Sequence, residues 1–288
     1  MIEFNEENTV GIQRPAADTP TVPLLFDSPH SGRVYPDDFH FVLPHMRLRR
    51  AEDAFVDDLF SEAPKFGAAS IDAKFPRSYL DPNRSERDFS PDDLADSWTG
   101  ELKPSEKAEK GTGLIWVRLH GLTDIYAQKL TSAQLLRRTE TCWRPYHNAV
   151  RTAYDDLYGR FGRVYHLNCH SMRSVGNIKD PDGPVTRPDF VLSDRDGTTC
   201  EPGFANAALA FLKRRGYSVQ VNFPMKGFEL VRRYSDPAKH RHSMQIEINR
   251  RLYLDEDAIE KLPEFDRFKT TVTELISTLA GYAANKSK

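Results

Sequence analysis

Short blocks of apolar residues, separated by polar stretches, run along the chain, and their spacing predicts its secondary structure. Several apolar runs have the length of buried strands and end in turn-forming residues. They are VPLLFDS (22–28), AASIDAKF (68–75), TGLIWVRL (112–119), GRVYHLNCHS (162–171), PDFVLSD (188–194), YSVQVNF (217–223) and MQIEINRRLYL (244–254). Other stretches repeat apolar residues at helical spacing and predict helices. These stretches are 49–67, 132–160, 203–215 and 263–284, and Pro145 is expected to kink or split the second.

Strands that alternate with helices are typical of an α/β sandwich with a mixed, mostly parallel sheet. In such sheets the functional residues gather where strands end and loops begin. Residues 1–20 are polar and predict a loose N-terminal leader. No Gly- or Pro-rich linker divides the remainder, so residues 21–288 are predicted to form a single domain.

Composition and charge limit the partners that the chain is expected to have. Forty Lys and Arg balance forty-two Asp and Glu, for a net charge of −2, which argues against nucleic acid or an anionic membrane as the main partner. A local basic pocket for a small anionic molecule remains compatible with this balance. The N-terminal residues lack the apolar stretch typical of a secretory signal, no long apolar run follows, and the three cysteines are far apart, so a reducing, cytoplasmic location is expected. The sequence leaves the oligomeric state open.

Two histidines occupy equivalent places in the predicted sheet. His30, in SPHSG, follows a buried strand and is close to a glycine that permits close backbone approach, and His170, in LNCHSM, also lies where a strand meets a loop. Each histidine alone is more often a hydrogen-bonded core residue. Together with a carboxylate they match a catalytic zinc site, which takes three protein ligands and keeps one position open.

Charged residues elsewhere supply the other parts of a candidate site. Asp53 and Asp57 are four apart and would share one face of the predicted helix, although an acidic, solvated helix face is an equally good interpretation. The segment FPRSYLDPNRSER places arginines around Asp81 and Asn83, and a guanidinium suits bidentate capture of a carboxylate. In MQIEINRRLYL the alternation directs Glu247 away from Ile246 and Ile248, toward any neighbouring cleft or toward solvent.

Several separated motifs, in this order, resemble the N-formylglutamate amidohydrolase family over roughly residues 22–256. They are PLLFDSPHSG, EDAFVDDLF, PRSYLDPNR, WRPYH, HSMRS, PDFVLSD, NFPMKG and MQIEINRRLYLDE. The family is related to the zinc carboxypeptidases and aspartoacylases. The resemblance therefore implies a three-layer α/β/α fold of the zinc carboxypeptidase-like, phosphorylase/hydrolase-like kind.

The resemblance also implies roles for particular residues. It implies one divalent metal ion, with zinc as the first choice and cobalt or manganese also compatible. The implied ligands are His30, Asp53 and His170. In the carboxypeptidase pattern the carboxylate lies three residues after the first histidine, but that position is Arg33 here, so the carboxylate comes from elsewhere, with Asp53 preferred and Glu52 as the alternative. The implied base is Glu247.

The remaining implied roles concern the substrate. Arg77 is expected to polarise the scissile carbonyl, and Asn83 and Arg84 to grip a substrate carboxylate. Lys226, or alternatively Arg232, would serve a second carboxylate. His147, in WRPYH, is expected either to support the site or to be structural. The family pattern departs at two places, because Asn168 stands where an Asp is frequent and NFPMKGF lacks a second glycine.

The implied reaction is hydrolysis of N-formyl-L-glutamate to L-glutamate and formate, a step of histidine degradation. Two alternatives remain open. One is an amidohydrolase of the same fold that acts on another N-acyl amino acid or small carboxylate-bearing amide. The other is a non-catalytic protein that binds a small molecule.

Overall fold

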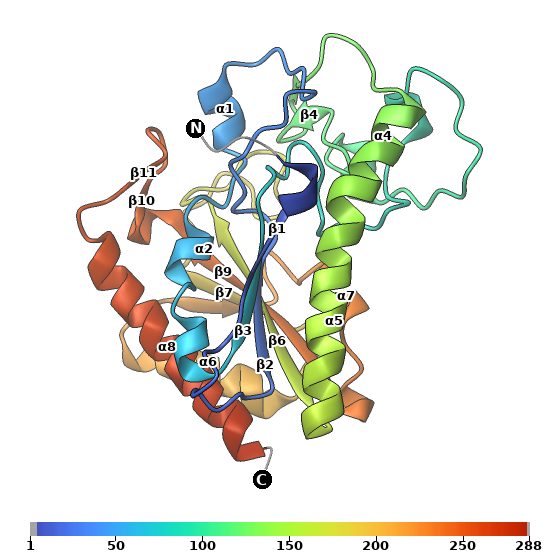
Figure 1. Cartoon of the computed structure of the whole chain (residues 1–288). Coiled ribbons are helices and arrows are strands. Elements are labelled where there is room, and N and C mark those ends of the chain that lie inside the picture. The colour runs from blue at the N-terminus through green and yellow to red at the C-terminus, as the bar shows by residue number, and fades with distance from the viewer. Residues whose placement is uncertain (1–4, 287–288) are drawn as a thin grey trace. The chain divides into compact units, whose positions relative to one another are not determined.

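The computed structural model describes residues 5–286, in which helices and strands alternate along the chain (Figure 1). The strands are β1 (Val10–Gln13), β2 (Leu24–Ser28), β3 (Ala69–Ala73), β4 (Arg118–Leu119), β5 (Thr123–Asp124), β6 (Val164–Met172), β7 (Phe190–Ser193), β8 (Val219–Val221), β9 (Arg241–Asn249), β10 (Leu254–Asp255) and β11 (Glu260–Lys261). The α-helices are α1 (His45–Arg49), α2 (Val56–Leu59), α3 (Glu106–Glu109), α4 (Ser132–Arg138), α5 (Arg144–Phe161), α6 (Pro202–Arg214), α7 (Glu229–Arg233) and α8 (Phe265–Lys286). Short 3₁₀ turns are η1 (Glu6–Asn8), η2 (Ala63–Phe66), η3 (Pro91–Asp93), η5 (Pro237–Lys239) and η6 (Arg250–Leu252), and η4 (Thr139–Trp143) is a π-helical segment.

Among the described residues, a seven-stranded sheet has the order β1-β3-β2-β6-β9-β7-β8. Strands β2, β6 and β9 pair in parallel, whereas β7 pairs antiparallel with β9 and parallel with β8. The predicted α/β fold with a mixed, mostly parallel sheet is therefore confirmed. Strand β1 lies within residues 1–20, the range expected to be a leader, and forms an edge of this sheet.

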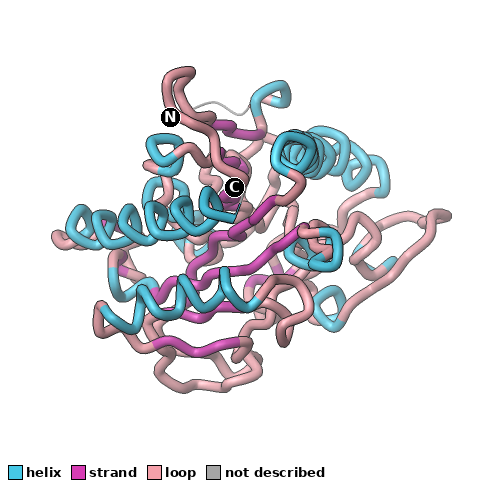
Figure 2. Tube along the Cα trace, turned by 90° about the horizontal axis from the view of Figure 1, so that it is seen from below, coloured by secondary structure: helices cyan, strands magenta, loops and turns pink. Residues whose placement is uncertain are grey.

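Helices cover both faces of the sheet, and adjacent residues of β6 show which helix lies on which face. The Tyr165 ring stacks on Phe204 of α6 and meets Tyr282 of α8. The next ring, His166, contacts Tyr154 of α5 instead. Since successive side chains of a strand point to opposite faces, α6 and α8 cover one face and α5 the other (Figures 1 and 2). Burial on both faces explains why the central strands are apolar over most of their length.

The chain folds into two compact units that alternate along the sequence. The first unit comprises residues up to Gly11, Pro29–Ala54 and Asp72–Asn148. The second comprises Ile12–Ser28, Phe55–Ile71 and the residues from Ala149 onward, and it holds β2, β6, β7, β8 and β9. The prediction of one domain over 21–288 stays a prediction.

Two predicted elements differ from the structure. The expected helix over 49–67 is wrong, because the Asp53 amide donates to the His30 carbonyl (2.9 Å) and Phe55 takes a left-handed conformation (φ 63°). Only the short α2 and η2 form there, and η2 ends at Gly67, whose φ of 81° is typical of a left-handed helix cap. The expected strand over 112–119 is also wrong except for β4, since the Leu114 amide bonds instead to the Asp88 carbonyl (2.6 Å).

The long helix predicted over 132–160 spans α4, η4 and α5 and is not split at Pro145. Proline has no amide hydrogen to donate four residues back, to the Thr141 carbonyl. The chain accommodates this with the π-helical segment η4, which ends two residues before the proline. The Thr9 hydroxyl donates to the Thr141 carbonyl instead (2.8 Å). The kink expected at this proline is thus a local change of helix type.

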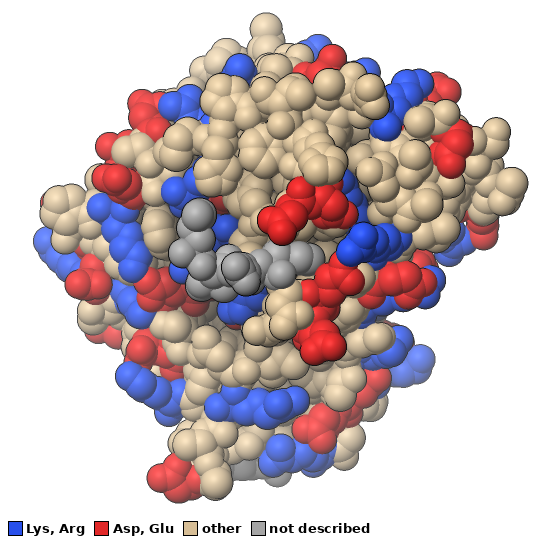
Figure 3. All heavy atoms as spheres, turned by 45° about the horizontal axis from the view of Figure 1, so that its top comes forward, with Lys and Arg blue, Asp and Glu red and all other residues tan. Residues whose placement is uncertain are grey.

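On the face shown in Figure 3, basic and acidic side chains are interspersed. This distribution agrees with the nearly balanced charge of the sequence. Within residues 5–286, none of the helices combines the length and the hydrophobicity needed to cross a bilayer.

Candidate metal centre and active site

His30 lies in the turn directly after β2, where the sequence places it. Its Nε2 lies 2.7 Å from Oδ1 of Asp81, and the same oxygen accepts the Asn83 amide (2.9 Å). The neighbouring Gly32 has the role predicted for it, because a Cβ there would overlap the Phe75 carbonyl oxygen. The turn that carries His30 can therefore approach the backbone after β3 closely.

Asp81 is fully buried and acts as the centre of the charged cluster in the first unit. Besides His30, its carboxylate faces Arg77 (3.0 Å), Arg84 (3.6 Å) and the Trp116 indole N–H (3.3 Å). Burial alone raises the pKa of Asp81, but the charges of Arg84, His30 and Arg77 outweigh it and hold that pKa well below its usual range. The ionised carboxylate accepts hydrogen bonds only, so Nε2 of His30 carries the hydrogen.

Asp53 lies in the turn between α1 and α2 and not on a helix face. Its Oδ2 is 3.4 Å from Nδ1 of His30. Glu52, the alternative carboxylate, accepts instead from the Tyr35 hydroxyl (2.8 Å) and from Arg49 (3.4 Å). Burial and the Glu52 carboxylate raise the pKa of Tyr35, so this tyrosine stays a hydrogen-bond donor. The structure thus brings Asp53 to the candidate metal ligand His30 and gives Glu52 a structural contact.

The arginines of PRSYLDPNR differ in how they are held. Arg77 bridges two carboxylates, with Nη2 near Asp81 and Nη1 3.8 Å from Asp53, and its guanidinium lies 4.8 Å from the centre of the Trp116 ring. Arg84 donates to the backbone carbonyls of Thr112 (3.1 Å) and Asn83 (2.9 Å). Both guanidiniums are therefore held in position by several contacts, and Arg77 lies next to the candidate ligand Asp53.

His147 and Trp143, from the motif WRPYH, support the loop that carries Asn83 and Arg84. The Trp143 indole donates to the Arg84 carbonyl (2.9 Å), and His147 Nε2 lies 2.8 Å from the Pro82 carbonyl. The two rings stack with centroids 3.9 Å apart. They are four residues apart and extend from one helix face. Of the two roles expected for His147, these contacts favour support of the site, through the loop that carries Asn83 and Arg84.

In the second unit, His170 and Glu247 lie side by side. The parallel pairing of β6 with β9 places the two residues opposite each other in register, so both side chains are on the same sheet face. Gln245 donates to Oε1 of Glu247 (2.8 Å) and restricts its orientation. Glu247 is 7% exposed, so the strand is buried on both faces and the solvent-exposed alternative for this residue is wrong.

Behind His170, the same sheet face carries further buried polar residues. His170 Nε2 lies 2.7 Å from the Asn168 side-chain oxygen, and the Asn168 amide donates to Asp27 of β2 (2.7 Å). His166 also bonds to Asp27 (2.8 Å). Sequence reasoning assigned no role to Asp27 or His166. A charged residue at the end of the apolar run PLLFD is the one signal that pointed to Asp27.

His30, Asp53 and His170 form a buried group that could hold a metal ion, since one ligand atom from each lies within 4.8 Å of the others. Two imidazoles and a carboxylate are a common donor set for catalytic zinc. Ligand atoms about 2.0–2.1 Å from a tetrahedral zinc ion are roughly 3.3 Å apart. The 3.4 Å between His30 Nδ1 and Asp53 Oδ2 is close to this value, so these two residues fit such an ion.

Lys226 and Arg232, proposed for a second substrate carboxylate, are more exposed than the other candidates. Lys226 pairs with Asp196 at 2.8 Å, with both side chains about 60% exposed. Arg232 contacts Glu229, on the same short helix α7. Their contact with a substrate stays a prediction.

A cysteine nucleophile is not supported. Burial raises the pKa of Cys142 to about 12 and the pKa of Cys169 well above its usual range, so neither provides a thiolate near neutral pH. Cys169 also points to the sheet face opposite His170.

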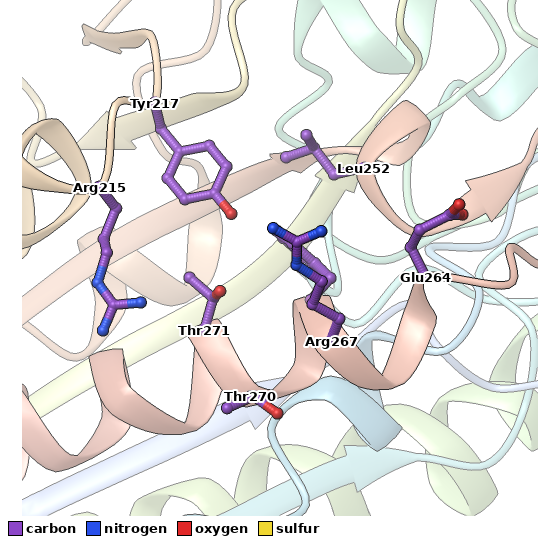
Figure 4. Close-up of a pocket in the computed structure, with 8 residues that line it drawn as sticks. Arg215, Tyr217, Leu252, Glu264, Arg267, Thr270 and Thr271 are labelled. Atoms are coloured by element: carbon purple, nitrogen blue, oxygen red, sulfur yellow. The ribbon is translucent and has the colours of Figure 1, made fainter.

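A surface hollow of about 450 Å³ lies beside the start of α8 (Figure 4). It is lined by Arg215, Tyr217, Leu252, Glu264, Arg267, Phe268, Thr270 and Thr271. None of the predicted site residues lines it, so this hollow is not the candidate site.

Comparison with known proteins identifies the family. The family model for N-formylglutamate amidohydrolase matches residues 22–254. N-formylglutamate deformylase of Pseudomonas putida is 30% identical over 240 residues, which cover 82% of this chain and 83% of the relative. The crystal structure of N-formylglutamate amidohydrolase from Ralstonia eutropha JMP134 is 40% identical, covers 96% of this chain and 99% of its own, and superposes with a TM-score of 0.90.

A more distant structure, the gene product Atu2144 from Agrobacterium tumefaciens, shares the fold. It is 19% identical, covers 96% of each chain and superposes with a TM-score of 0.63. The family model spans most of the chain, and the P. putida relative meets it over more than four fifths of its length. The chain described here therefore belongs to the N-formylglutamate amidohydrolase family.

Proposed function

We propose that the chain hydrolyses the amide bond of N-formyl-L-glutamate and releases L-glutamate and formate. The observation that carries this proposal is the buried group of His30, Asp53 and His170 in a member of this hydrolase family. The names of the P. putida and R. eutropha relatives support the choice of substrate. The family implies a small anionic substrate, and the charged cluster around Asp81 supplies cations that suit one.

The proposed metal ligands are His30, Asp53 and His170, with zinc as the first choice. When bound, a divalent metal ion supplies Lewis-acid polarisation of the carbonyl and lowers the pKa of water. Nδ1 of His30 suits ligation because Nε2 is occupied by the bond to Asp81. Asp53 is preferred to Glu52, which is engaged by Tyr35.

Glu247 is the proposed general base. It takes a proton from the attacking water as the water oxygen bonds to the formyl carbon, and it delivers that proton to the amine nitrogen as the C–N bond breaks. Its place on a buried strand, held by Gln245, supports this role because a base must keep a fixed orientation.

Arg77 is proposed to stabilise the oxyanion that develops on the formyl oxygen. A positioned donor of this kind typically contributes roughly 3–4 kcal/mol. Asn83 and Arg84 are proposed to bind a carboxylate of the substrate. Support for this comes from the contacts of Trp143 and His147 that hold their loop, since a held loop orients a bound substrate.

The first test combines metal analysis with hydrolysis assays on the purified protein. We expect about one divalent metal ion per chain, loss of activity with a chelator and recovery when zinc is added back. Formyl-, acetyl- and succinyl-glutamate are compared as substrates, and the formyl compound is expected to react fastest. Full activity of the metal-free protein would contradict the metal proposal. Equal rates on the three compounds would contradict the formyl assignment, and no turnover of any would favour a binding protein.

A further inference from the structure

One face of β6 carries a continuous line of buried polar side chains that ends at His170. Along this face, His166, Asn168 and His170 follow each other at every second position, and none is more than 2% exposed. Hydrogen bonds of 2.7–2.8 Å join them through Asp27 of the neighbouring strand. At the far end, His166 Nδ1 meets the Ser243 hydroxyl (2.8 Å). An unpaired polar group in such a buried network would cost free energy of folding. Each member here has a hydrogen-bond partner, and these bonds restrict its orientation.

Asp27 decides how the Asn168 side chain is oriented. The two residues are opposite each other in the parallel pair of β2 and β6. An ionised carboxylate only accepts hydrogen bonds, so the group of Asn168 that faces it must be the NH₂. The carbonyl oxygen of the same carboxamide is then turned toward His170. The nitrogen and oxygen of a carboxamide are nearly equal in size, so their hydrogen-bond partners decide which is which. Here the Asp27 carboxylate assigns them.

The orientation of Asn168 in turn decides which nitrogen of His170 carries the hydrogen. A carboxamide oxygen accepts and cannot donate, so Nε2 of His170 must be the N–H. In a neutral imidazole the lone pair is then on Nδ1. Nδ1 is therefore the atom that His170 offers as a metal ligand.

We propose that Asp27 and Asn168 are positioning residues for the metal centre. Together they set the tautomer and the ring orientation of His170. This inference rests on the metal site of the proposed function. It also gives the two histidine ligands unequal partners, since His30 is backed by the carboxylate of Asp81 and His170 by a neutral amide oxygen.

The same geometry predicts what an Asp at position 168 of this chain would do. An Asp at this position would place a second carboxylate about 2.7 Å from Asp27, the present distance between Asn168 Nδ2 and Asp27 Oδ1. Two carboxylates this close in a buried place cannot both ionise. The residues at 27 and 168 are therefore a coupled pair, with one charge between them.

The experiment measures the zinc dissociation constant of the full chain by competition with a chelator. Asn168→Leu is expected to weaken zinc binding by about 10- to 100-fold, as removal of a ligand's hydrogen-bond partner typically does. The matched control is Asn249→Leu, which removes another fully buried carboxamide of the same sheet, bonded to the carbonyls of Arg187 and Pro188. The control is expected to bind zinc within about threefold of the wild type. Equal zinc affinity of Asn168→Leu and wild type would overturn the inference.

A charge exchange tests the coupling and does not depend on how Asn168→Leu folds. Asn168→Asp alone is expected to weaken zinc binding, because its new carboxylate faces Asp27. In the double variant Asp27→Asn/Asn168→Asp, the new amide at position 27 donates to the new carboxylate at position 168, and this carboxylate still accepts from His170. The same amide donates to Nε2 of His166, which then carries its hydrogen on Nδ1 and donates it to the Ser243 hydroxyl. Zinc affinity is therefore expected to return to within about threefold of the wild type. A double variant no better than Asn168→Asp would overturn the inference.

The tautomer is read directly by ¹⁵N NMR of histidine-labelled, metal-free protein, with the His170 signals assigned through a His170→Gln variant. The wild type is expected to show the Nε2–H form of His170, and Asn168→Leu is expected to lose this preference. A wild-type His170 protonated only at Nδ1 would contradict the inference. If the wild type binds no divalent metal, the proposed function fails; if it binds zinc but Asn168→Leu binds equally well, only the present inference fails.

Discussion

Glu247 is held by two features of β9, its register opposite His170 and the hydrogen bond from Gln245. A glutamate on a surface strand would sample many rotamers, whereas this carboxylate is buried and oriented. Proton transfer depends on such an orientation, because donor and acceptor must be within hydrogen-bond reach. Strand β9 thus provides the orientation that Glu247 needs to act as the proposed base.

At the residue scale, Glu247→Gln is expected to keep the metal and to lose at least about 100-fold in kcat on N-formyl-L-glutamate. The amide has nearly the same size as the carboxylate but does not accept a proton, and general-base contributions are of this order. The control is Glu52→Gln, a second buried glutamate whose bond from Tyr35 an amide oxygen can still accept. The control should keep both metal and rate within a few-fold. A near-normal rate for Glu247→Gln would assign the base to another residue.

At the scale of elements, the π-helical segment η4 and the start of α5 connect the helix to the loop of Asn83 and Arg84. Pro145 has no amide hydrogen for a regular α-helical bond, so a change of helix type costs little at this point. The π-helical segment ends at Trp143. From there the Trp143 and His147 rings reach the carbonyls of Arg84 and Pro82. The motif WRPYH thus serves the site without providing a group that reacts.

Trp143→Phe is therefore expected to raise KM for N-formyl-L-glutamate by about 5- to 10-fold, with a smaller effect on kcat. The change keeps the aromatic ring but removes the indole N–H, and one such hydrogen bond contributes about 1 kcal/mol. Steady-state kinetics measure this. The matched control is Trp98→Phe, since the Trp98 indole N–H donates no hydrogen bond within the part of the chain that the structure describes. An equal rise of KM in both variants would contradict a specific role for Trp143.

For the molecule as a whole, buried charges make stability depend on pH. Asp81 has a pKa well below its usual range in the folded state, because the charges of Arg84, His30 and Arg77 outweigh the effect of burial. An unfolded chain has a normal aspartate pKa, about 3.9. A depressed pKa therefore contributes stability that is present above about pH 4 and is lost as the pH falls through the folded value.

The free energy of unfolding, measured by urea denaturation, is accordingly expected to fall as the pH decreases below about 4. Asp81→Asn should be destabilised by roughly 3 kcal/mol at pH 7, since it leaves buried cations without their partner, and it should lose less stability than the wild type below about pH 4. The exposed change Asp37→Asn serves as control and should follow the wild-type curve. Parallel curves for Asp81→Asn and wild type would show that Asp81 does not cause the acid sensitivity.

The extent to which the sequence predicted the candidate site depended on the kind of residue. His30, His170 and Glu247 follow from strand patterns and motif resemblance, because the ends of parallel strands bring such residues to one edge of a sheet. Asp53 follows from resemblance alone, since the helix predicted to carry it does not form and the His30 carbonyl takes its amide instead. The structure adds a reason to prefer Asp53 over Glu52, because Glu52 accepts a hydrogen bond from Tyr35.

The sequence by itself determined the family, the alternation of strands and helices, and the types of the residues with chemistry, because these are properties of local pattern and motif order. Only the tertiary structure decided which partners those residues have. His30 meets Asp81 across 51 positions and Asn168 meets Asp27 across 141. Such contacts depend on which strands and turns become neighbours, and that is a consequence of packing and hydrogen-bond satisfaction over the whole chain.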